Sequence, residues 1–103
     1  MQRAYATAME QAYPFTRHAH QRSGERSIPP LVVEAIISYG HSFDAGDGTR
    51  KYALTKEGMA ELRRFTGRPI ANAIDAYRRR NAYVVVARGA IVTVAYASKP
   101  FFH

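Results

Sequence analysis

The sequence predicts a single α+β domain in which leading helices pack on an antiparallel sheet of about four strands. Three observations support this fold class: helical periodicity of apolar residues, glycine-containing turns between β-rich runs, and a 47% hydrophobic composition over 103 residues. Two further helices are expected before the final hairpin, so that helices and strands are segregated rather than alternating. A single domain, residues 1–103, is therefore predicted, since a chain of this length has the usual size of one domain.

The N-terminal quarter of the chain is expected to be helical. Residues 2–12 are rich in residues that favour helices, and they form most of a predicted helical extension over 1–13. Thr16 can cap a second, short helix over 17–23, and Gly24 ends it.

A third helix is expected to start near Pro30 and to continue through LVVEAIISY to Gly40. The β-branched residues of this run are also compatible with a strand. The proline at the start and the glycine at the end favour a buried helix.

Two β-hairpins are predicted. In HSFDAGDGTRKYALT, strands near 41–45 and 50–54 flank GDG, a turn sequence that supplies positive φ angles. Near the C-terminus, AYVVVA and AIVTVAYA flank Arg88 and Gly89, which indicates an antiparallel hairpin at the centre of a sheet.

Residues 55–81 separate these hairpins and are interpreted as a helical insertion. Thr55 opens the first helix and Gly67 ends it. Pro69 starts the second helix, whose apolar face is predicted to consist of Ile70, Ala73, Ile74 and Tyr77.

The composition excludes several classes of site. The chain has no cysteine, which excludes disulfides, zinc–cysteine sites and cysteine nucleophiles, and no metal or other cofactor is predicted. No apolar stretch approaches the roughly 20 residues of a membrane span, and MQRAYATAMEQAY lacks the apolar segment of a signal peptide. A cytoplasmic location without membrane contact is therefore the expectation.

The charge is strongly skewed. Fifteen basic residues against eight acidic ones give a net charge of +7, and twelve of the fifteen are arginine. Because the guanidinium group binds phosphate bidentately and stacks on bases, a nucleic acid is the expected partner. The alternative is an arginine- and alanine-rich composition that reflects GC-rich coding DNA.

The segment FTRHAHQRSGERSIPP contains the histidines that are candidates for chemistry. On a helix, His18 and Arg22 are four residues apart and share a face, whereas His20 points elsewhere. An imidazole that transfers a proton beside a guanidinium that stabilises charge on phosphorus suits phosphodiester chemistry. The alternatives are a solvated helix face and a salt bridge from Arg22 to a nearby glutamate.

The stretch HAHQRSGERSIPPLVVEAIISYG, followed by a hairpin and YVVVARGAIVTVAY, resembles a known pattern. In that pattern, H-A-x-x-R-x-x-x-R-x-I precedes a helix and strands, and the last strand reads I-V/I-T-V-x-Y. It belongs to a small family of uncharacterised domains of the barnase–EndoU–colicin–RelE fold, which metal-independent RNases and many bacterial toxins share. The resemblance covers residues 15–54 and 82–97 and implies a toxin-like RNase core.

The resemblance also implies roles for individual residues. His18 and Arg22 match the first histidine and arginine of the motif, and together with Arg50 they are the expected catalytic residues. The RNA-binding residues expected from the resemblance are Arg26, Tyr52, Thr93 and Tyr96, and the basic character of the protein adds Arg78, Arg79 and Arg80. Among these, the arginine triplet belongs to the insertion, which departs from the family, and its positions in a last helical turn also suit the helix dipole. Ser27 stands where the family has glycine.

Strand geometry offers alternative interpretations for Arg50 and for the pair Thr93 and Tyr96. Arg50 lies opposite Asp44 in the predicted hairpin, so the alternative to a catalytic role is a cross-strand ion pair between the two. Strict alternation places Thr93 and Tyr96 on opposite faces unless a bulge intervenes, and Tyr96 is then a core aromatic with a solvated hydroxyl.

Three hypotheses for the function follow. The first is a metal-independent endoribonuclease of toxin type that cleaves RNA by attack of the 2′-hydroxyl, with an acidic antitoxin or immunity protein as its inhibitor. The second is a non-catalytic nucleic-acid-binding domain. The third is a protein-interaction module whose charge is incidental. The sequence predicts no oligomeric state.

Overall fold

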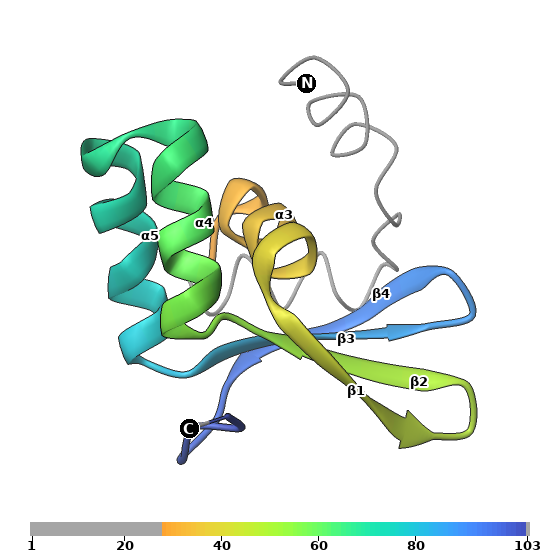
Figure 1. The fold of residues 1–103 in the computed structure, drawn as a ribbon. Coiled ribbons are helices and arrows are strands. Elements are labelled where there is room, and N and C mark those ends of the chain that lie inside the picture. The colour runs from red at the N-terminus through yellow and green to blue at the C-terminus, as the bar shows by residue number, and fades with distance from the viewer. Residues whose placement is uncertain (1–27, 103) are drawn as a thin grey trace.

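The computed structural model describes residues 28–102, which form an α+β fold of three helices and four strands (Figure 1). In chain order the elements are α3 (Pro30–Tyr39), β1 (His41–Gly46), β2 (Thr49–Ala53), α4 (Lys56–Thr66), α5 (Arg68–Arg79), β3 (Ala82–Ala87) and β4 (Ala90–Tyr96). The predicted fold class is confirmed, including the two helices that precede the last strand pair. The helices expected over 2–12 and 17–23 lie outside the described residues.

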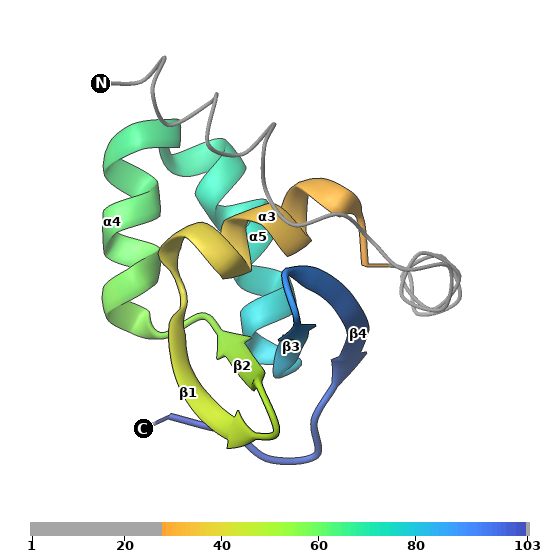
Figure 2. The same ribbon diagram turned by 90° about the vertical axis from the view of Figure 1, so that its right-hand side faces the viewer.

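The four strands form one antiparallel sheet in the order β1-β2-β3-β4. One row across the sheet pairs Phe43 with Lys51, Lys51 with Val85, and Val85 with Thr93. Figures 1 and 2 show all three helices on one side of this sheet. The segment after β4 passes over the other side, so the two faces have different coverings (Figure 1).

Helix α3 forms despite its β-branched residues, as the flanking proline and glycine predict. Pro30 occupies its first turn, and the backbone N–H of Gly40 donates to the carbonyl of Ile36 at 2.8 Å. A side chain at residue 40 has no room, because a Cβ there would lie 2.7 Å from the carbonyl oxygen of Ala53. The end of α3 therefore lies directly against the end of β2.

Both predicted hairpins are present. The first turn has positive φ angles at Gly46, Asp47 and Gly48, which fits the expected role of GDG. The final turn does the same at Arg88 and Gly89, with φ angles of 53° and 77°. The strands of the first hairpin end within one residue of the expected positions.

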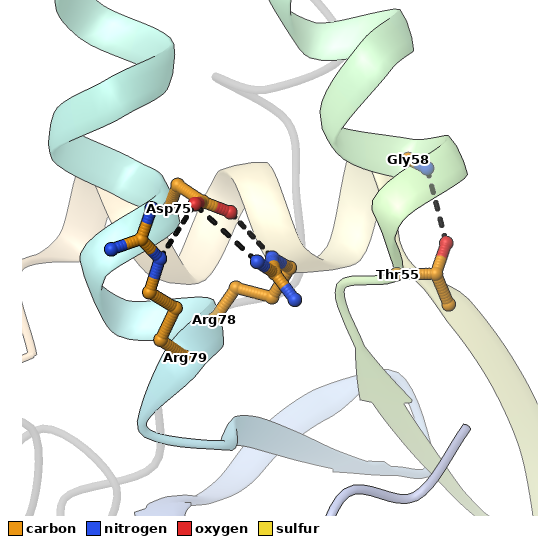
Figure 3. Close-up of polar contacts among 5 residues, drawn as sticks. All are labelled: Thr55, Gly58, Asp75, Arg78 and Arg79. Carbon is orange, nitrogen blue, oxygen red and sulfur yellow. Dashed lines mark hydrogen bonds and ion pairs between the residues drawn. The ribbon is translucent and has the colours of Figure 1, made fainter. Parts of the chain in front are cut away.

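Helix α4 begins as the sequence predicts. The side-chain oxygen of Thr55 accepts a hydrogen bond from the N–H of Gly58 at 3.0 Å, which satisfies one of the free amides of the first turn (Figure 3). Gly58 also permits a close approach, since a Cβ there would lie 2.3 Å from the carbonyl oxygen of Tyr39. Met59 and Leu62 then bury the helix against the core.

The apolar face of α5 is as predicted at Ile74 and Tyr77, which are buried and packed against the core respectively, and differs at Ile70 and Ala73. The buried residues are Ala71 and Ile74, whereas Ile70 is 46% exposed and Ala73 is exposed. Ala71 and Ile74 are three residues apart and continue to Arg78 one turn later, so the buried stripe is rotated relative to the expected one. As a result Arg78 lies at the edge of the packed face, with 22% of its side chain exposed.

The core lies between the three helices and the sheet. Its largest fully buried side chains are Ile28, Val33, Ile36, Leu62, Val84, Ile91 and Val94. Among the helices of residues 28–102, none has the length and apolar character to cross a membrane.

Candidate nucleic-acid interface

The sheet face turned away from the helices is called the open face, and five of its residues are His41, Phe43, Lys51, Tyr83 and Thr93. The pairing register places them on one side, since partners across neighbouring strands share a face and alternate residues along a strand do too. This face is the side of the sheet on which the chain continues after β4 (Figure 1).

Aromatic side chains gather on the open face. Phe101 packs edge to face on Tyr83 at a centroid distance of 5.0 Å and contacts Phe43 at 5.8 Å. Phe102 contacts Phe43 at 5.8 Å and His41 at 5.6 Å. These five residues are called the aromatic cluster. Since these side chains remain partly or largely exposed, their rings provide a surface on which planar groups can stack.

Lys51 adds a positive charge to the aromatic cluster. Its Nζ lies 5.5 Å from the ring centroid of Phe101 and 5.9 Å from that of Tyr83. Within residues 28–102, no carboxylate forms an ion pair with Lys51. A cation beside accessible aromatic rings is the combination by which proteins hold the phosphates and bases of single-stranded nucleic acids.

The structure places Arg50 and Tyr52 on the side of the sheet that faces the helices. Tyr52 packs against the hydrophobic core. Arg50 is exposed at the hairpin end, where its Nε and Nη2 donate to the hydroxyl of Ser42 at 3.3 and 3.0 Å. Asp44 is its register partner, but the Asp44 carboxylate accepts from the backbone N–H of Gly46 at 2.9 Å instead. The alternative of a cross-strand ion pair is therefore wrong.

Thr93 and Tyr96 lie on opposite faces, as strict alternation predicts. The bulge in the β3–β4 pairing falls between Ile91 and Thr93, which leaves the alternation from Thr93 to Tyr96 unchanged. Tyr96 packs against the core, and the guanidinium carbon of Arg80 lies 4.0 Å from its ring centroid. The Tyr96 hydroxyl is buried without a hydrogen-bond partner in the described part of the chain. The prediction of a solvated hydroxyl at this position is therefore wrong. Burial raises the pKa of Tyr96 above its ordinary value of 10.0, although the charge of Arg80 acts in the opposite direction.

The arginines that end α5 are not equally available to a ligand. The Asp75 carboxylate pairs with Nε of Arg78, accepts from Nη2 of Arg78 at 3.4 Å, and accepts from Nε of Arg79 at 3.1 Å (Figure 3). Arg78 reaches from α5 toward the start of α4 and is fixed by both of its bonds. Arg79 is 74% exposed, and its two terminal nitrogens make no hydrogen bond to any residue described.

The hydrogen bond from Arg78 is the largest cause that lowers the pKa of the Asp75 carboxyl below its ordinary value of 3.8. The charges of Arg78 and Arg79 act in the same direction, whereas burial of the carboxyl opposes them. Only 14% of the Asp75 side chain is exposed. The ion pairs of Asp75 with Arg78 and Arg79 in the last turns of α5 are therefore partly shielded from water.

A cavity of about 640 Å³ lies between the start of α4, the end of α5 and the C-terminal segment. Its charged lining residues are Lys56, Glu57, Arg78 and Arg79. Phe101 and Phe102 belong to its lining as well, so the cavity borders the aromatic cluster of the open face. We call it the helix-end cavity.

His18, Arg22 and Arg26 lie outside the described residues, so their relation to Arg50 stays a prediction. Within residues 28–102, no three histidine or acidic side chains gather in a way that could hold a metal ion. Sequence reasoning did not predict Phe43, Lys51, Tyr83, Phe101 or Phe102 as site residues. The Phe-Phe pair after Pro100 was the available signal, since two adjacent apolar aromatics in a polar tail need a surface to cover.

No family model, curated protein or solved structure matches this chain. The resemblance to the RNase-toxin fold therefore rests on the sequence motifs alone.

Proposed function

We propose that this protein binds single-stranded RNA on the open face and cleaves it as a metal-independent endoribonuclease of toxin type. The observation that carries the binding is the aromatic cluster with Lys51 beside it, a cation that has no ion pair within residues 28–102. The net charge of +7 supports it, because a basic protein attracts the phosphate backbone regardless of sequence. An RNA substrate would place the activity in the cytoplasm.

The proposed reaction needs no metal, since RNA carries its own nucleophile. The 2′-hydroxyl oxygen forms a bond to phosphorus, and the bond from phosphorus to the 5′-oxygen breaks, which leaves a 2′,3′-cyclic phosphate and a 5′-hydroxyl end. A base takes the proton from the 2′-hydroxyl, and an acid returns a proton to the departing 5′-oxygen. His18 is the proposed proton-transfer group, and Arg22 and Arg50 would stabilise the charge on the phosphate. The motif H-A-x-x-R supports these roles.

A toxin of this kind would require an inhibitor in the cell that makes it. The chemistry that fits is an acidic antitoxin or immunity protein, whose carboxylates would face the cationic surface.

A specific observation favours the second function, a non-catalytic nucleic-acid-binding domain. Arg50, an expected catalytic residue, lies on the helix side of the sheet, whereas the aromatic cluster and Lys51 lie on the open face. RNA stacked on the open face is therefore separated from Arg50 by the sheet, unless the strand passes around the exposed hairpin end. Binding without cleavage is compatible with that separation, because it needs no contact between the RNA and Arg50.

Incubating the purified protein with single-stranded RNA in EDTA tests the first function against the second. We expect fragments with 2′,3′-cyclic phosphate and 5′-hydroxyl ends, detected by end-specific labelling on a gel. Bound but intact RNA would support the second function and refute the cleavage. RNA that is neither bound nor cut would refute both and would favour a protein-interaction module.

A further inference from the structure

The helix-end cavity has the size of a ligand site and a lining that the open-face interface does not use. Its volume of about 640 Å³ falls within the range of about 300–1,000 Å³ that is usual for small-molecule sites. It adjoins the aromatic cluster, since Phe101 and Phe102 contribute to both. A chain bound to the open face can therefore extend into it.

Cations dominate the charged lining of the cavity. Arg79 lies largely in solvent, and its Nε bond to Asp75 leaves both terminal nitrogens available to an anion. Lys56 is exposed and forms no ion pair within residues 28–102. Arg78 is paired with Asp75, which compensates its charge, so it is not counted among the cations available to a ligand.

The lining contains one acidic residue, Glu57, against these cations. The Glu57 side chain is 86% exposed, and its Oε1 lies 3.9 Å from Nε2 of His41. Water screens the exposed charges of Glu57, Arg79 and Lys56 alike, so the two cations still exceed the single carboxylate. The cavity thus offers an anion two available cations, Lys56 and Arg79.

The uncharged part of the cavity lining suits a planar group. Phe101 and Phe102 line it together with the apolar Ala53, Leu54, Ala82 and Pro100. Asn81 also lines it, and its Nδ2 donates to the carbonyl of Ala97 at 3.3 Å, which leaves the side-chain oxygen to accept from a ligand. Cations and aromatic rings in one lining are what a phosphate joined to a base requires.

We propose that the helix-end cavity binds one nucleotide unit, with its phosphate at Arg79 and Lys56 and its base against Phe101 and Phe102. This inference rests on the proposed function, because the nucleotide is one residue of the RNA that lies on the open face. The cavity would hold the strand at a fixed position and would favour bases that fit its lining.

Calorimetric titration with adenosine 5′-monophosphate, inorganic phosphate, adenosine and a 2′-O-methylated oligonucleotide tests the proposal. The modified oligonucleotide lacks the 2′-hydroxyl nucleophile, so it is bound without being cut. We expect adenosine 5′-monophosphate to bind more tightly than phosphate or adenosine alone and to compete with the oligonucleotide. Arg79→Gln and Lys56→Gln should each weaken its binding by about tenfold, the usual loss for a hydrogen bond to a charged group.

Arg63→Gln is the matched control, because it removes the same charge from an exposed residue of α4 that does not line the cavity. Its binding of adenosine 5′-monophosphate should equal that of the unmodified protein. Lys56→Gln keeps the proposal testable if Arg79→Gln destabilises the fold, since Lys56 has no ion pair in the described residues.

The outcomes separate this inference from the proposed function. Oligonucleotide binding that both cavity variants retain, without binding of adenosine 5′-monophosphate, overturns the cavity proposal and leaves RNA binding intact. Nucleotide binding that the variants lose, without oligonucleotide binding, supports the cavity as a site for a free nucleotide and overturns the RNA function. Equal affinity for phosphate and adenosine 5′-monophosphate overturns the role of the aromatic wall.

Discussion

Replacing His18 with asparagine should slow RNA cleavage by about 100- to 10,000-fold, the usual contribution of a general acid or base. Asparagine keeps a hydrogen-bonding side chain of similar size but cannot transfer a proton at neutral pH. The measurement is the single-turnover rate of cleavage of a labelled RNA in EDTA, with protein in excess over RNA. Binding of the RNA should change little, because the loss concerns a proton in the transition state.

His20→Asn is the control for this substitution. It removes the same group two residues away, on the other side of the predicted helix, and should leave the rate within about twofold of the unmodified protein, which is far less than the loss expected of an acid or base. Equal rates for both variants and the unmodified protein would contradict the role of His18, and so would equal losses in the two variants.

The Asp75→Asn substitution should lower the free energy of unfolding by about 2 kcal/mol, in the range of hydrogen bonds to charged groups. It leaves the partly buried guanidinium of Arg78 without its carboxylate, and it removes the bond to Arg79 as well. Urea unfolding followed by circular dichroism at pH 7 measures the difference. Glu61→Gln is the matched control, because the pair between Glu61 and Arg64 has the same i,i+3 spacing but is exposed. That variant should lose less than about 0.5 kcal/mol.

The same variant has a defined pH dependence. The pKa of the Asp75 carboxyl is lowered in the folded protein, so its stabilising effect is fully present above 3.8, the ordinary value. The effect is lost as the pH falls through the folded pKa, where the carboxyl becomes protonated in both states. The stability difference between Asp75→Asn and the unmodified protein should therefore be constant above about pH 5 and shrink below pH 3.8. A difference that grows on acidification would contradict the assignment.

The fold was predictable where local signals and periodicity agreed. Pro30 and Gly40 bound α3, Thr55 caps α4, and the turn at residues 46–48 sets the first hairpin. Pro30 acts through its fixed φ, Thr55 through a side-chain acceptor and the turn through accessible positive φ angles. Gly40, in contrast, is required because a side chain there has no room beside Ala53. The buried stripe of α5 was not predictable, because Ile70 and Ala71 are both compatible with an apolar face. Packing against α3 and α4 decides between them.

The site was less predictable than the fold, since it depends on contacts distant in sequence. Spacing alone indicates that Asp75 can pair with Arg78 and Arg79, yet it cannot show which of them keeps free donors. Arg50 donates to the hydroxyl of Ser42 and not to the carboxylate of Asp44. Which of the two it reaches depends on the detailed geometry of the hairpin. Phe101 and Phe102 pack on a face that exists only once the four strands have paired. The local sequence around these two residues therefore cannot show which surface they cover.

Binding of a fluorescein-labelled, 2′-O-methylated oligouridylate, followed by anisotropy over a series of KCl concentrations, tests the central claim most directly. The unmodified protein should bind, with an affinity that falls steeply with salt as phosphate contacts are lost. Lys51→Gln should weaken binding and reduce the slope of log affinity against log salt by about 1, the effect of one lost phosphate contact. Arg63→Gln, on the helix side of the sheet, should leave that slope unchanged. Absence of binding at low salt would contradict RNA binding on the open face. So would equal slopes of log affinity against log salt for Lys51→Gln and Arg63→Gln.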